Sequence, residues 1–475
     1  MDIKYKPTIG LEVHAELKTK TKMFCACKND SDEERPNVNI CPVCMGHPGT
    51  LPVINKEAVR SVLKVGLAIG GELARFSEFD RKNYFYPDIP KGYQISQYKY
   101  PLVSGGELAG VSITRVHLEE DTGTSSHDGE HSLVNFNRAG VPLMELVTEP
   151  VMHSSEEVVH FGKELQMLLQ YLEVAEANME KGEMRLEANI SVAPQRSDLE
   201  EGPKGQTLGT KVEVKNLNSF RAAERAVEYE IKRQTELLES GGKVDQETRG
   251  WNEGKQSTFS QRSKEDSHDY RYFPDPDLPK LNLSLVPEFD KEVLMSQLKE
   301  TPNQKRDKFK KDYSIKESDV EFYISSRDFS NLFEASAKEL AGGDFQLLSN
   351  YVVSDLSGIG EKALKISPED LAELIKMAGS GEVSSRGAKD IIAKMIETGE
   401  APKVIAEKSG LFQKSDEGEL LAVVEKIVGE NPEVVTEYKA GKAEVLQFLV
   451  GQGMKASKGS ANPKVLADLF KQKLS

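Results

Sequence analysis

The stretch IGLEVHAEL at residues 9–17 contains the pattern from which the fold of this chain is predicted. Apolar and polar residues alternate along it, as they do in a β-strand that has one buried face and one polar face. Glu12, His14 and Glu16 all lie on the polar face. Because two carboxylates and an imidazole are costly to bury in an apolar core, we expect this face to contact water or to line a polar site.

Other segments have the same short, strand-like character. They are VSITRVHLEED (111–121), SLVNFNR (132–138), MRLEANISVAP (184–194) and TKVEVKNLN (210–218). Two amphipathic helices interrupt them. The first begins near Ser154, where Ser154 and Glu157 fit a capping box, and the second runs from about Ser219 to the Gly241-Gly242 pair. This mixture indicates an α+β domain with a mainly antiparallel sheet.

The character of the sequence changes twice along the chain. Residues 1–292 are rich in strand-like runs, residues 293–410 are helical and charged, and residues 411–475 form a further small helical segment. We therefore expect an N-terminal, mainly antiparallel-sheet domain, then a helical domain, then a small helical tail domain. A chain of 475 residues is long enough for about two to four domains.

Composition and charge narrow the class of protein. The hydrophobic content of 38% and the charged content of 29% are ordinary for a globular protein. No apolar run reaches the roughly 18 residues of a membrane span, and the N-terminus shows no secretory signal, so we expect a cytoplasmic protein without a membrane partner. A net charge of −15 argues against nonspecific nucleic-acid binding over the whole surface. Residues 451–475 form the one clearly basic stretch.

The four cysteines form two close pairs, Cys25-x-Cys27 and Cys41-x-x-Cys44. Two pairs of thiolates, each supplied by one tight turn, suit tetrahedral zinc coordination. Free thiols or a disulfide are the alternatives, but disulfides are rare in the cytoplasm. We predict a closed, structural zinc site with all four cysteines as ligands, which would pin a loop rather than catalyse a reaction.

Acidic residues recur in and beside the strand-like segments. In HLEEDTG (117–123), the residues His117, Glu119 and Asp121 share one face of the strand, and Glu120 lies on the other. Further acids at strand ends are Glu149, Glu187 and Glu213. Carboxylates combined with water and substrate phosphates are the ligands that Mg2+ prefers. The phosphate-loop motif G-x-x-x-x-G-K-[ST] is absent, so a nucleotide site would be of another kind.

Several longer motifs, each different, are distributed over nearly the whole chain. They are IGLEVHAEL (9–17), CPVCMGHPGTLPVIN (41–55), FDRKNYFYPDIPKGYQISQ (79–97), HLEEDTG (117–123), FNRAGVPLMELVTEP (136–150), EVKNLNSF (213–220), TRGWNE (248–253), RSKEDSHDYRYFPDPDLP (262–279) and the C-terminal GQGMKASKGSANPKVL. With these motifs the chain resembles the GatB family, the B subunits of heterotrimeric tRNA-dependent amidotransferases.

The resemblance implies an architecture and a reaction. Residues 1–292 would be a cradle domain with the kinase and transamidase site, and residues 293–410 and 411–475 would bind tRNA. The reaction would use ATP and Mg2+ to phosphorylate the side chain of Glu on tRNA(Gln) or Asp on tRNA(Asn), and ammonia would then form the amide. The resemblance implies that the amidase, or A, subunit supplies the ammonia and that a small C subunit braces the complex. With four cysteines assigned to zinc and no Gly/Ser-rich amidase segment, this chain itself offers no glutaminase nucleophile.

The motifs supply candidate residues for this reaction. We predict that Glu12 and His14, with Glu119 or Glu120, bind Mg2+ or hold its water shell, and that Glu149 and Glu213 are weaker members of the same catalytic cluster. Lys82, Asn83 and Tyr84 are expected to meet ATP or the acceptor end of the tRNA. Lys215, Asn216, Asn218 and Ser219 offer hydrogen-bond donors at a strand-to-helix turn that suits phosphate. Asn218 would serve equally well as a helix N-cap.

Two further positions bear on these assignments. Many relatives have Asp where this chain has Glu187, which keeps Glu187 outside the assigned ligands. The segment Tyr270–Asp275 combines an arginine with several aromatic residues. RNA stacking is one interpretation of that pattern, and a packed or channel-lining wall is the interpretation that we favour, because aromatic side chains mostly pack.

Two alternative functions remain to be distinguished. The archaeal-type relative GatE carries a large inserted domain, whereas here DYRYFPDPDLPKLNLSLVPEFD (269–290) runs directly into the helical region. A noncatalytic zinc-binding RNA scaffold is the second alternative, and it predicts solvated acids and no use of ATP. The polar face of residues 9–17 and the acidic net charge argue against it.

Overall fold

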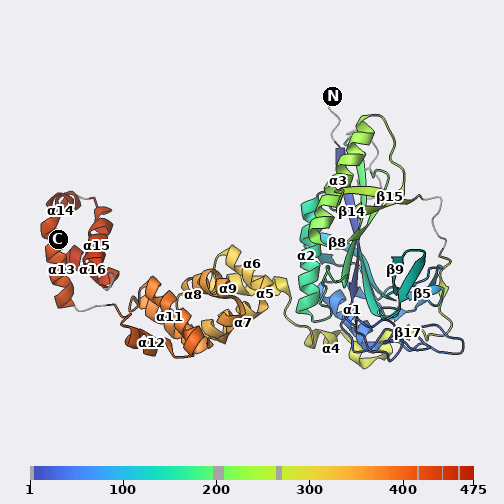
Figure 1. Cartoon of the computed structure of the whole chain (residues 1–475), viewed down its shortest axis with the longest axis horizontal. Coiled ribbons are helices and arrows are strands. Elements are labelled where there is room, and N and C mark those ends of the chain that lie inside the picture. Colours follow the sequence, from blue (N-terminus) through green and yellow to red (C-terminus); the bar gives the residue numbers. More distant parts are fainter. Residues whose placement is uncertain are drawn as a thin grey trace. The chain divides into compact units, whose positions relative to one another are not determined.

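The computed structural model describes residues 5–195, 208–263, 270–413, 417–440, 442–457 and 461–474 (Figure 1). The chain forms two compact units, residues 1–302 and residues 303–475. In the described parts of the chain, every helix is too short or too polar to span a membrane.

A large sheet is the centre of the first unit. Its strands follow the order β15-β14-β13-β12-β1-β11-β8-β6-β2, with β7 paired to β8, and the described pairs are antiparallel except β13 with β14. The strands are β1 (Tyr5–Glu16), β2 (Glu72–Leu73), β6 (Val103–Ser104), β7 (Glu107–Leu108), β8 (Val111–Glu120), β11 (Pro142–Thr148), β12 (Met184–Pro194), β13 (Val212–Leu217), β14 (Glu247–Asn252) and β15 (Ser257–Ser263). The predicted α+β class with a mainly antiparallel sheet is confirmed.

Helices cover the apolar face of this sheet. In Figure 1, α2 (Ser155–Tyr171) and α3 (Phe220–Glu239) lie along one side of the large sheet, and α1 (Lys56–Ala68) packs near its lower end. The alternation predicted for β1 is confirmed, because Ile9, Leu11 and Val13 are buried in the core beneath the helices. The polar residues between them consequently point to the opposite face.

Side-chain caps start both predicted helices. Ser154 accepts a hydrogen bond from the backbone N–H of Glu157 at the start of α2, and Ser219 accepts one from Ala222 at the start of α3. The sequence did not predict α1, which begins after an Asn55 cap. A short α4 (Lys291–Ser296) follows near the end of the unit.

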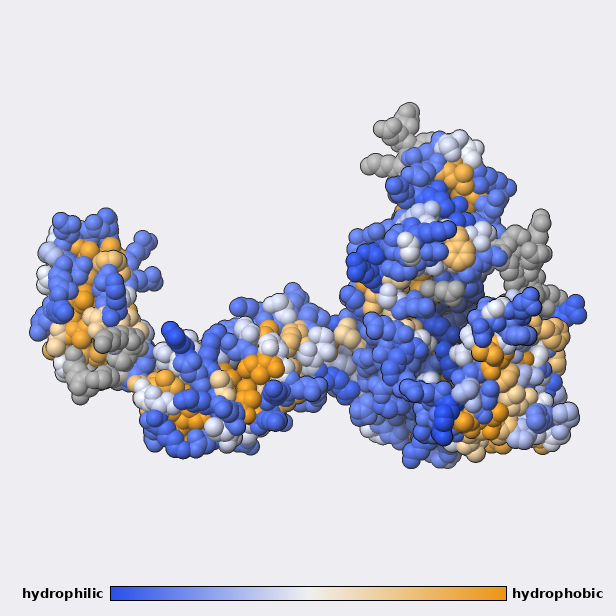
Figure 2. Space-filling model, viewed as in Figure 1, coloured by the Kyte–Doolittle hydropathy of each residue, from blue (hydrophilic) through white to orange (hydrophobic). Residues whose placement is uncertain are grey.

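Smaller sheets lie on the side of the large sheet away from α2 and α3 (Figure 1). They are formed by β16 (Phe273–Pro274), β4 (Asp80–Asn83) and β5 (Tyr93–Ser96), by β9 (Thr124–Asp128) and β10 (His131–Asn135), and by β3 (Phe76–Ser77) and β17 (Leu281–Asn282). The β5 strand is tied to β8, since Ile95 N–H donates to the Glu120 carboxylate at 2.9 Å. Figure 2 shows hydrophobic residues gathered around β5 and β17 on a face of this unit that is otherwise mostly hydrophilic.

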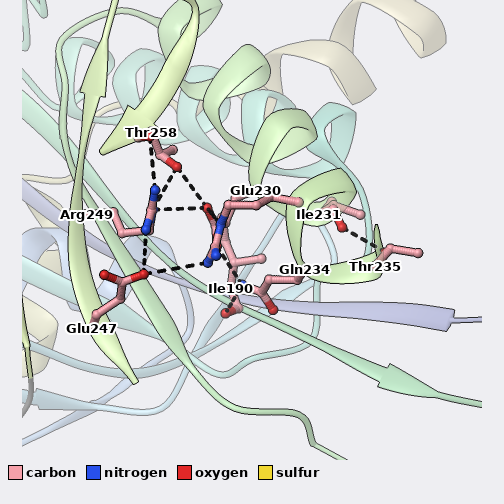
Figure 3. A network of polar contacts seen from close by, with 9 residues as sticks. Ile190, Glu230, Ile231, Gln234, Thr235, Glu247, Arg249 and Thr258 are labelled. Atoms are coloured by element: carbon pink, nitrogen blue, oxygen red, sulfur yellow. Dashed lines mark hydrogen bonds and ion pairs between the residues drawn. The ribbon is translucent and has the colours of Figure 1, made fainter. Parts of the chain in front are cut away.

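A buried ion network fixes α3 to the edge of the large sheet (Figure 3). The Glu230 side chain is fully buried, and its carboxylate accepts a 2.6 Å hydrogen bond from Arg233 and a 2.9 Å hydrogen bond from Gln234. From the sheet, Thr258 donates to Glu230 at 3.1 Å, and Arg249 lies 3.6 Å away. A buried carboxylate is tolerated here because cations and donors surround it.

We expect Glu230→Gln to lower the free energy of unfolding of the first unit by about 3 kcal/mol, because Arg233 and Arg249 then share one counter-charge, that of Glu247, instead of two. The single tryptophan of the chain, Trp251, lies on β14 and reports unfolding of this unit by fluorescence. The control is Glu236→Gln, in an exposed pair with Lys232, which should cost less than about 0.5 kcal/mol. Equal denaturation midpoints for the two variants would contradict the assigned role of the network.

The second unit is helical in its described parts. Its helices are α5 (Pro302–Lys308), α6 (Glu317–Ser325), α7 (Arg327–Leu340), α8 (Phe345–Tyr351), α9 (Ser357–Ile359), α10 (Pro368–Ser380), α11 (Ser385–Thr398), α12 (Pro402–Ser409), α13 (Glu417–Glu430), α14 (Pro432–Lys439), α15 (Val445–Ala456) and α16 (Pro463–Leu474). Phe309, Tyr323 and Phe333 pack together in its first part. Helices α13 to α16 share a separate hydrophobic cluster that includes Leu449 and Phe470.

Candidate functional site

The polar face of the large sheet lines a cavity of about 800 Å3. The strand register brings its functional groups side by side, because residues directly opposite each other in an antiparallel pair point to the same face. His14 on β1 is paired with Glu145 on β11, and Glu145 with His117 on β8. On the other side of β1, Glu12 is paired with Glu187 on β12.

The first group of polar side chains in the cavity is His14, Glu119 and Glu145. The imidazole Nε2 of His14 lies 3.6 Å from a carboxylate oxygen of each acid, and His117 lies 3.1 Å from Glu145. Burial lowers the pKa of His14, but Glu145 and Glu119 outweigh it and raise the pKa to about 9. Burial acts to raise the pKa of Glu145, yet His117 and His14 hold it well below its usual range. The raised pKa of His14 and the lowered pKa of Glu145 favour an imidazolium beside the Glu145 carboxylate at neutral pH.

The second group is Glu12, Glu187 and Glu213, and one oxygen of each lies within 4.8 Å of the others. Lys215 is 3.0 Å from Glu187 and 3.3 Å from Glu213. Burial and the neighbouring acids Glu145 and Glu187 raise the pKa of Glu12. Burial also acts to raise the pKa of Glu187, but Lys215 outweighs it and the pKa is lowered. Three mutually repelling carboxylates with one lysine form a site that another cation would stabilise.

Neighbouring polar residues orient this second group. Asn189 donates a 2.9 Å hydrogen bond to Glu12, and Thr248 donates a 2.8 Å hydrogen bond to Glu213. Among the described residues, the buried amide oxygen of Asn189 has no hydrogen-bond partner. All-oxygen donors of this kind, with an additional free carbonyl oxygen beside them, fit a hard divalent cation such as Mg2+.

Two of the acids assigned from the sequence do not line the cavity. Glu120 lies on the other face of β8 and is paired with Lys91, because successive residues of a strand point in opposite directions. Glu149 follows the end of β11 and accepts a 2.9 Å hydrogen bond from Thr114. The structure therefore brings Glu12, His14, Glu119 and Glu213 together, and leaves Glu120 and Glu149 outside the group.

Of the residues predicted to bind ATP or the acceptor end, some line the cavity and others do not. Lys82, Tyr84 and Lys215 line the cavity. The side chain of Asn83 instead donates to the backbone carbonyl oxygens of Tyr270 at 3.2 Å and Arg271 at 2.9 Å. Beyond β13, Asn218 is exposed, and Ser219, rather than Asn218, caps α3. The side chain of Asn216 lies outside the described residues.

Several lining residues were not assigned from the sequence. They are Glu145, Glu187, Arg115, Arg185 and Asp121. In the strand PLMELVT (142–148), Glu145 is the single acid among mostly apolar residues, and this isolated acid could have been recognised in the sequence. Asp121 accepts hydrogen bonds from Arg138 at 2.6 Å and from Arg185 at 2.8 Å, so it anchors a cation at the edge of the cavity.

The four cysteines lie together in a separate loop region. The sulfur atoms of Cys25, Cys27, Cys41 and Cys44 are all within 4.8 Å of one another, and those of Cys41 and Cys44 are 3.9 Å apart. Tetrahedral zinc with Zn–S bonds near 2.3 Å requires sulfur separations of about 3.8 Å. A hydrogen bond from Cys25 and the charge of the buried Lys22 outweigh burial and lower the pKa of Cys44 to about 5. The donor set and its geometry therefore fit zinc.

Comparison with known proteins connects this fold and this cavity to one family. A family model described as the GatB/GatE catalytic domain matches residues 7–286, and one described as the GatB domain matches residues 331–474. The chain is 44% identical over 488 residues to the B subunit of the aspartyl/glutamyl-tRNA(Asn/Gln) amidotransferase of Thermoanaerobacter pseudethanolicus, with 100% of both chains covered. It is 45% identical over 489 residues to the same subunit of Caldanaerobacter subterraneus, again with 100% of both covered. The match to the protein of the same name from Dehalococcoides mccartyi is 43% over 500 residues, with 99% of both covered. The chain belongs to the GatB family.

Proposed function

We propose that this chain is the catalytic B subunit of an amidotransferase that phosphorylates the side-chain carboxylate of Glu-tRNA(Gln) or Asp-tRNA(Asn) with ATP and then converts it to the amide. The observation that carries the proposal is the pair of acidic groups in one cavity, with cations of the chain beside them. The GatB family match agrees with this reaction. A noncatalytic scaffold would have no reason to gather buried carboxylates in a cavity of about 800 Å3.

The chemistry needs an activation step. A carboxylate is a poor acyl donor because oxide is a poor leaving group, and transfer of the terminal phosphoryl group of ATP to it creates an acyl phosphate and ADP. Ammonia then attacks the acyl carbon, and inorganic phosphate leaves. Phosphoryl transfer depends mostly on positioning and on neutralisation of charge. Such a cavity therefore needs fixed cations and a means of holding phosphate oxygens.

We assign Mg2+ to Glu12, Glu187 and Glu213, whose oxygen atoms converge. When bound there, Mg2+ would neutralise phosphate charge. His14 and Glu119 lie 3.6 Å apart in the same cavity and would hold water and substrate in place. Compared with the ligands predicted from the sequence, this assignment keeps Glu12, adds Glu187 and Glu213, and gives His14 and Glu119 the water shell. It omits Glu120 because Glu120 lies on the other face of β8.

Positively charged side chains of the chain would bind the phosphates of ATP and the carboxylate of the substrate. The cavity is lined by the positively charged residues Lys82, Arg115, Arg185, Lys211 and Lys215. Burial lowers the pKa of Lys82, but Glu119 and other neighbours outweigh it and raise the pKa, so this lysine keeps its charge at neutral pH. Lys215 keeps its charge for the same reason, through Glu187 and Glu213.

We further assign partners and a second metal. Ammonia would come from the amidase, or A, subunit of the assembly, a small C subunit would brace it, and zinc would be held by the four cysteines. Residues 293–410 and 411–475 would bind the body of the tRNA, and the chain would act in the cytoplasm. The domain limits at residues 292 and 410 also belong to this proposal.

The test is turnover by the assembled enzyme with free ammonium as the nitrogen donor, which makes glutamine hydrolysis unnecessary. We expect ADP to form only when glutamyl-tRNA or aspartyl-tRNA is present, and amide to form in equal amount when ammonium is added. Parallel reactions with the two charged tRNAs identify the substrate. ADP formation that ignores the charged tRNA, or amide formation without ATP, would overturn the proposal.

A further inference from the structure

One side of the cavity is built from tyrosines. These residues, here called the tyrosine wall, are Tyr84, Tyr86, Tyr98, Tyr270 and Tyr272, and all of them line the cavity. The rings of Tyr98 and Tyr272 are stacked with centroids 4.4 Å apart, and Tyr84 meets Tyr270 edge-on at 5.8 Å. Among the described lining residues, β12 to β15 contribute charged, amide, hydroxyl and aliphatic side chains but no aromatic ring. The two sides of the cavity therefore differ in chemistry.

The backbone around the wall holds these rings in place. Asn83 on β4 donates from its side chain to the carbonyl oxygens of Tyr270 and Arg271, and its backbone N–H donates to Tyr270 at 2.9 Å. Arg271 has φ of 41°, in the left-handed region that costs free energy for a residue with a side chain. The Asn83 hydrogen bonds fix that turn and so present Tyr270 and Tyr272 beside Tyr84, which follows β4, and Tyr98, which follows β5. This explains why Asn83 does not itself reach into the cavity.

The wall is not a closed packing cluster. Tyr98 is 62% exposed and Tyr86 is 53% exposed, next to Phe85 at 86%. Tyrosines that served only the core would bury their rings. Here the rings run from the interior of the cavity to the protein surface. Tyr270 and Tyr272, from the segment for which the sequence predicts a packed or channel-lining wall, are only partly buried and both line the cavity.

A cation lies at the inner end of the wall. The ammonium of Lys82 is 5.2 Å from the ring centre of Tyr270. Among the described residues, no carboxylate forms a salt bridge with Lys82, so its charge is available to a ligand. Stacking rings with interleaved cations are the features by which proteins bind single-stranded nucleic acid.

We propose that the tyrosine wall stacks the unpaired 3′-terminal CCA nucleotides of the substrate tRNA and directs the amino acid on the last nucleotide toward the carboxylate groups. This inference rests on the proposed function and deepens it. Several adjacent rings offer more stacking surface than the single base of ATP can cover. The ATP phosphates instead suit the opposite side, where Lys215 and Thr248 adjoin the acids.

The experiment is equilibrium binding of uncharged tRNA to the assembled enzyme, with intact tRNA and with the same tRNA lacking its terminal CCA. Binding requires no turnover, so its outcome is separate from that of the amidation test. We expect the wild type to bind intact tRNA about ten-fold or more tightly than the truncated form. Tyr98→Leu and Tyr272→Leu should bring that ratio close to one, and Tyr98→Phe should retain it, because the ring remains.

The matched control is Tyr100→Leu, in the same segment but outside the cavity lining, which should keep the wild-type ratio. The KM for ATP should be unchanged in Tyr98→Leu. A wild-type ratio near one, or an unchanged ratio in Tyr98→Leu, would overturn the inference. A raised KM for ATP with an unchanged tRNA ratio would show that the wall holds the ATP base instead, which also overturns it.

Discussion

Glu12→Gln should lower the rate of amide formation by about a thousand-fold, which corresponds to roughly 4 kcal/mol of lost transition-state stabilisation. Glutamine has nearly the same size as glutamate but carries no charge, so the variant removes one anionic oxygen donor of the proposed Mg2+ site. The burial of Glu12 and its acidic neighbours already raise its pKa, so its charge is costly unless a cation is present. ADP formation dependent on glutamyl-tRNA should fall by the same factor.

The measurement is single-turnover amide formation by the assembled enzyme over a range of Mg2+ concentrations. The variant should need more Mg2+ for half-maximal rate, because the metal site loses a ligand. The matched control is Glu149→Gln. In the wild type the Glu149 carboxylate contacts Thr114 and does not line the cavity, so this variant should keep a near-normal rate. Unchanged turnover and unchanged Mg2+ dependence in Glu12→Gln would remove the metal from this position.

Loss of the zinc ligands should have the largest effect on stability. Structural zinc binds with an apparent free energy of roughly 10–16 kcal/mol in small domains, and part of this is folding free energy. We expect purified protein to contain one zinc ion per chain and Cys41→Ser to lose it. The loop of residues 21–50 should then become sensitive to proteolysis, and the thermal midpoint of the first unit should fall by several degrees or more.

The control for this prediction is His47→Asn. His47 lies in the same loop and belongs to a residue type that often binds zinc, but it is exposed and is not part of the cysteine cluster. That variant should retain zinc and stability. Metal analysis together with limited proteolysis distinguishes the two variants. Zinc-free wild-type protein with an equally stable loop would show that the four thiols have another role.

Local patterns in the sequence were sufficient for the elements and for one face of the site. The alternation in residues 9–17 predicted which residues of β1 face the core, and the residues Ser154 and Ser219 marked the starts of two helices. The same period of two placed Glu119 and Glu120 on opposite faces of one strand, which the structure confirms. These inferences succeed because strand alternation and helix caps depend on residues within a few positions of one another.

The choice among the acids required the tertiary structure. Glu145 and Glu187 enter the cavity only because β11 and β12 pair with β1 in the observed register, so that they lie opposite His14 and Glu12. Register is fixed by contacts between residues far apart in the chain, and a shift of one residue would turn each side chain to the other face. The period of two separates Glu120 from Glu119, but the pairing of Glu120 with Lys91 depends on a residue 29 positions away in the chain.

Other features of the protein also separate into those that local sequence predicts and those that depend on tertiary structure. The sequence by itself determined the α+β class, the alternation of β1, the close pairing of four cysteines and the resemblance that names a family. Only the tertiary structure decided that Asn83 supports the tyrosine wall, that Glu230 is fully buried, and which carboxylates share a cavity. The physical reason is that burial, ion pairing and the convergence of ligands are set by long-range packing, whereas secondary structure follows from the neighbours of each residue along the chain.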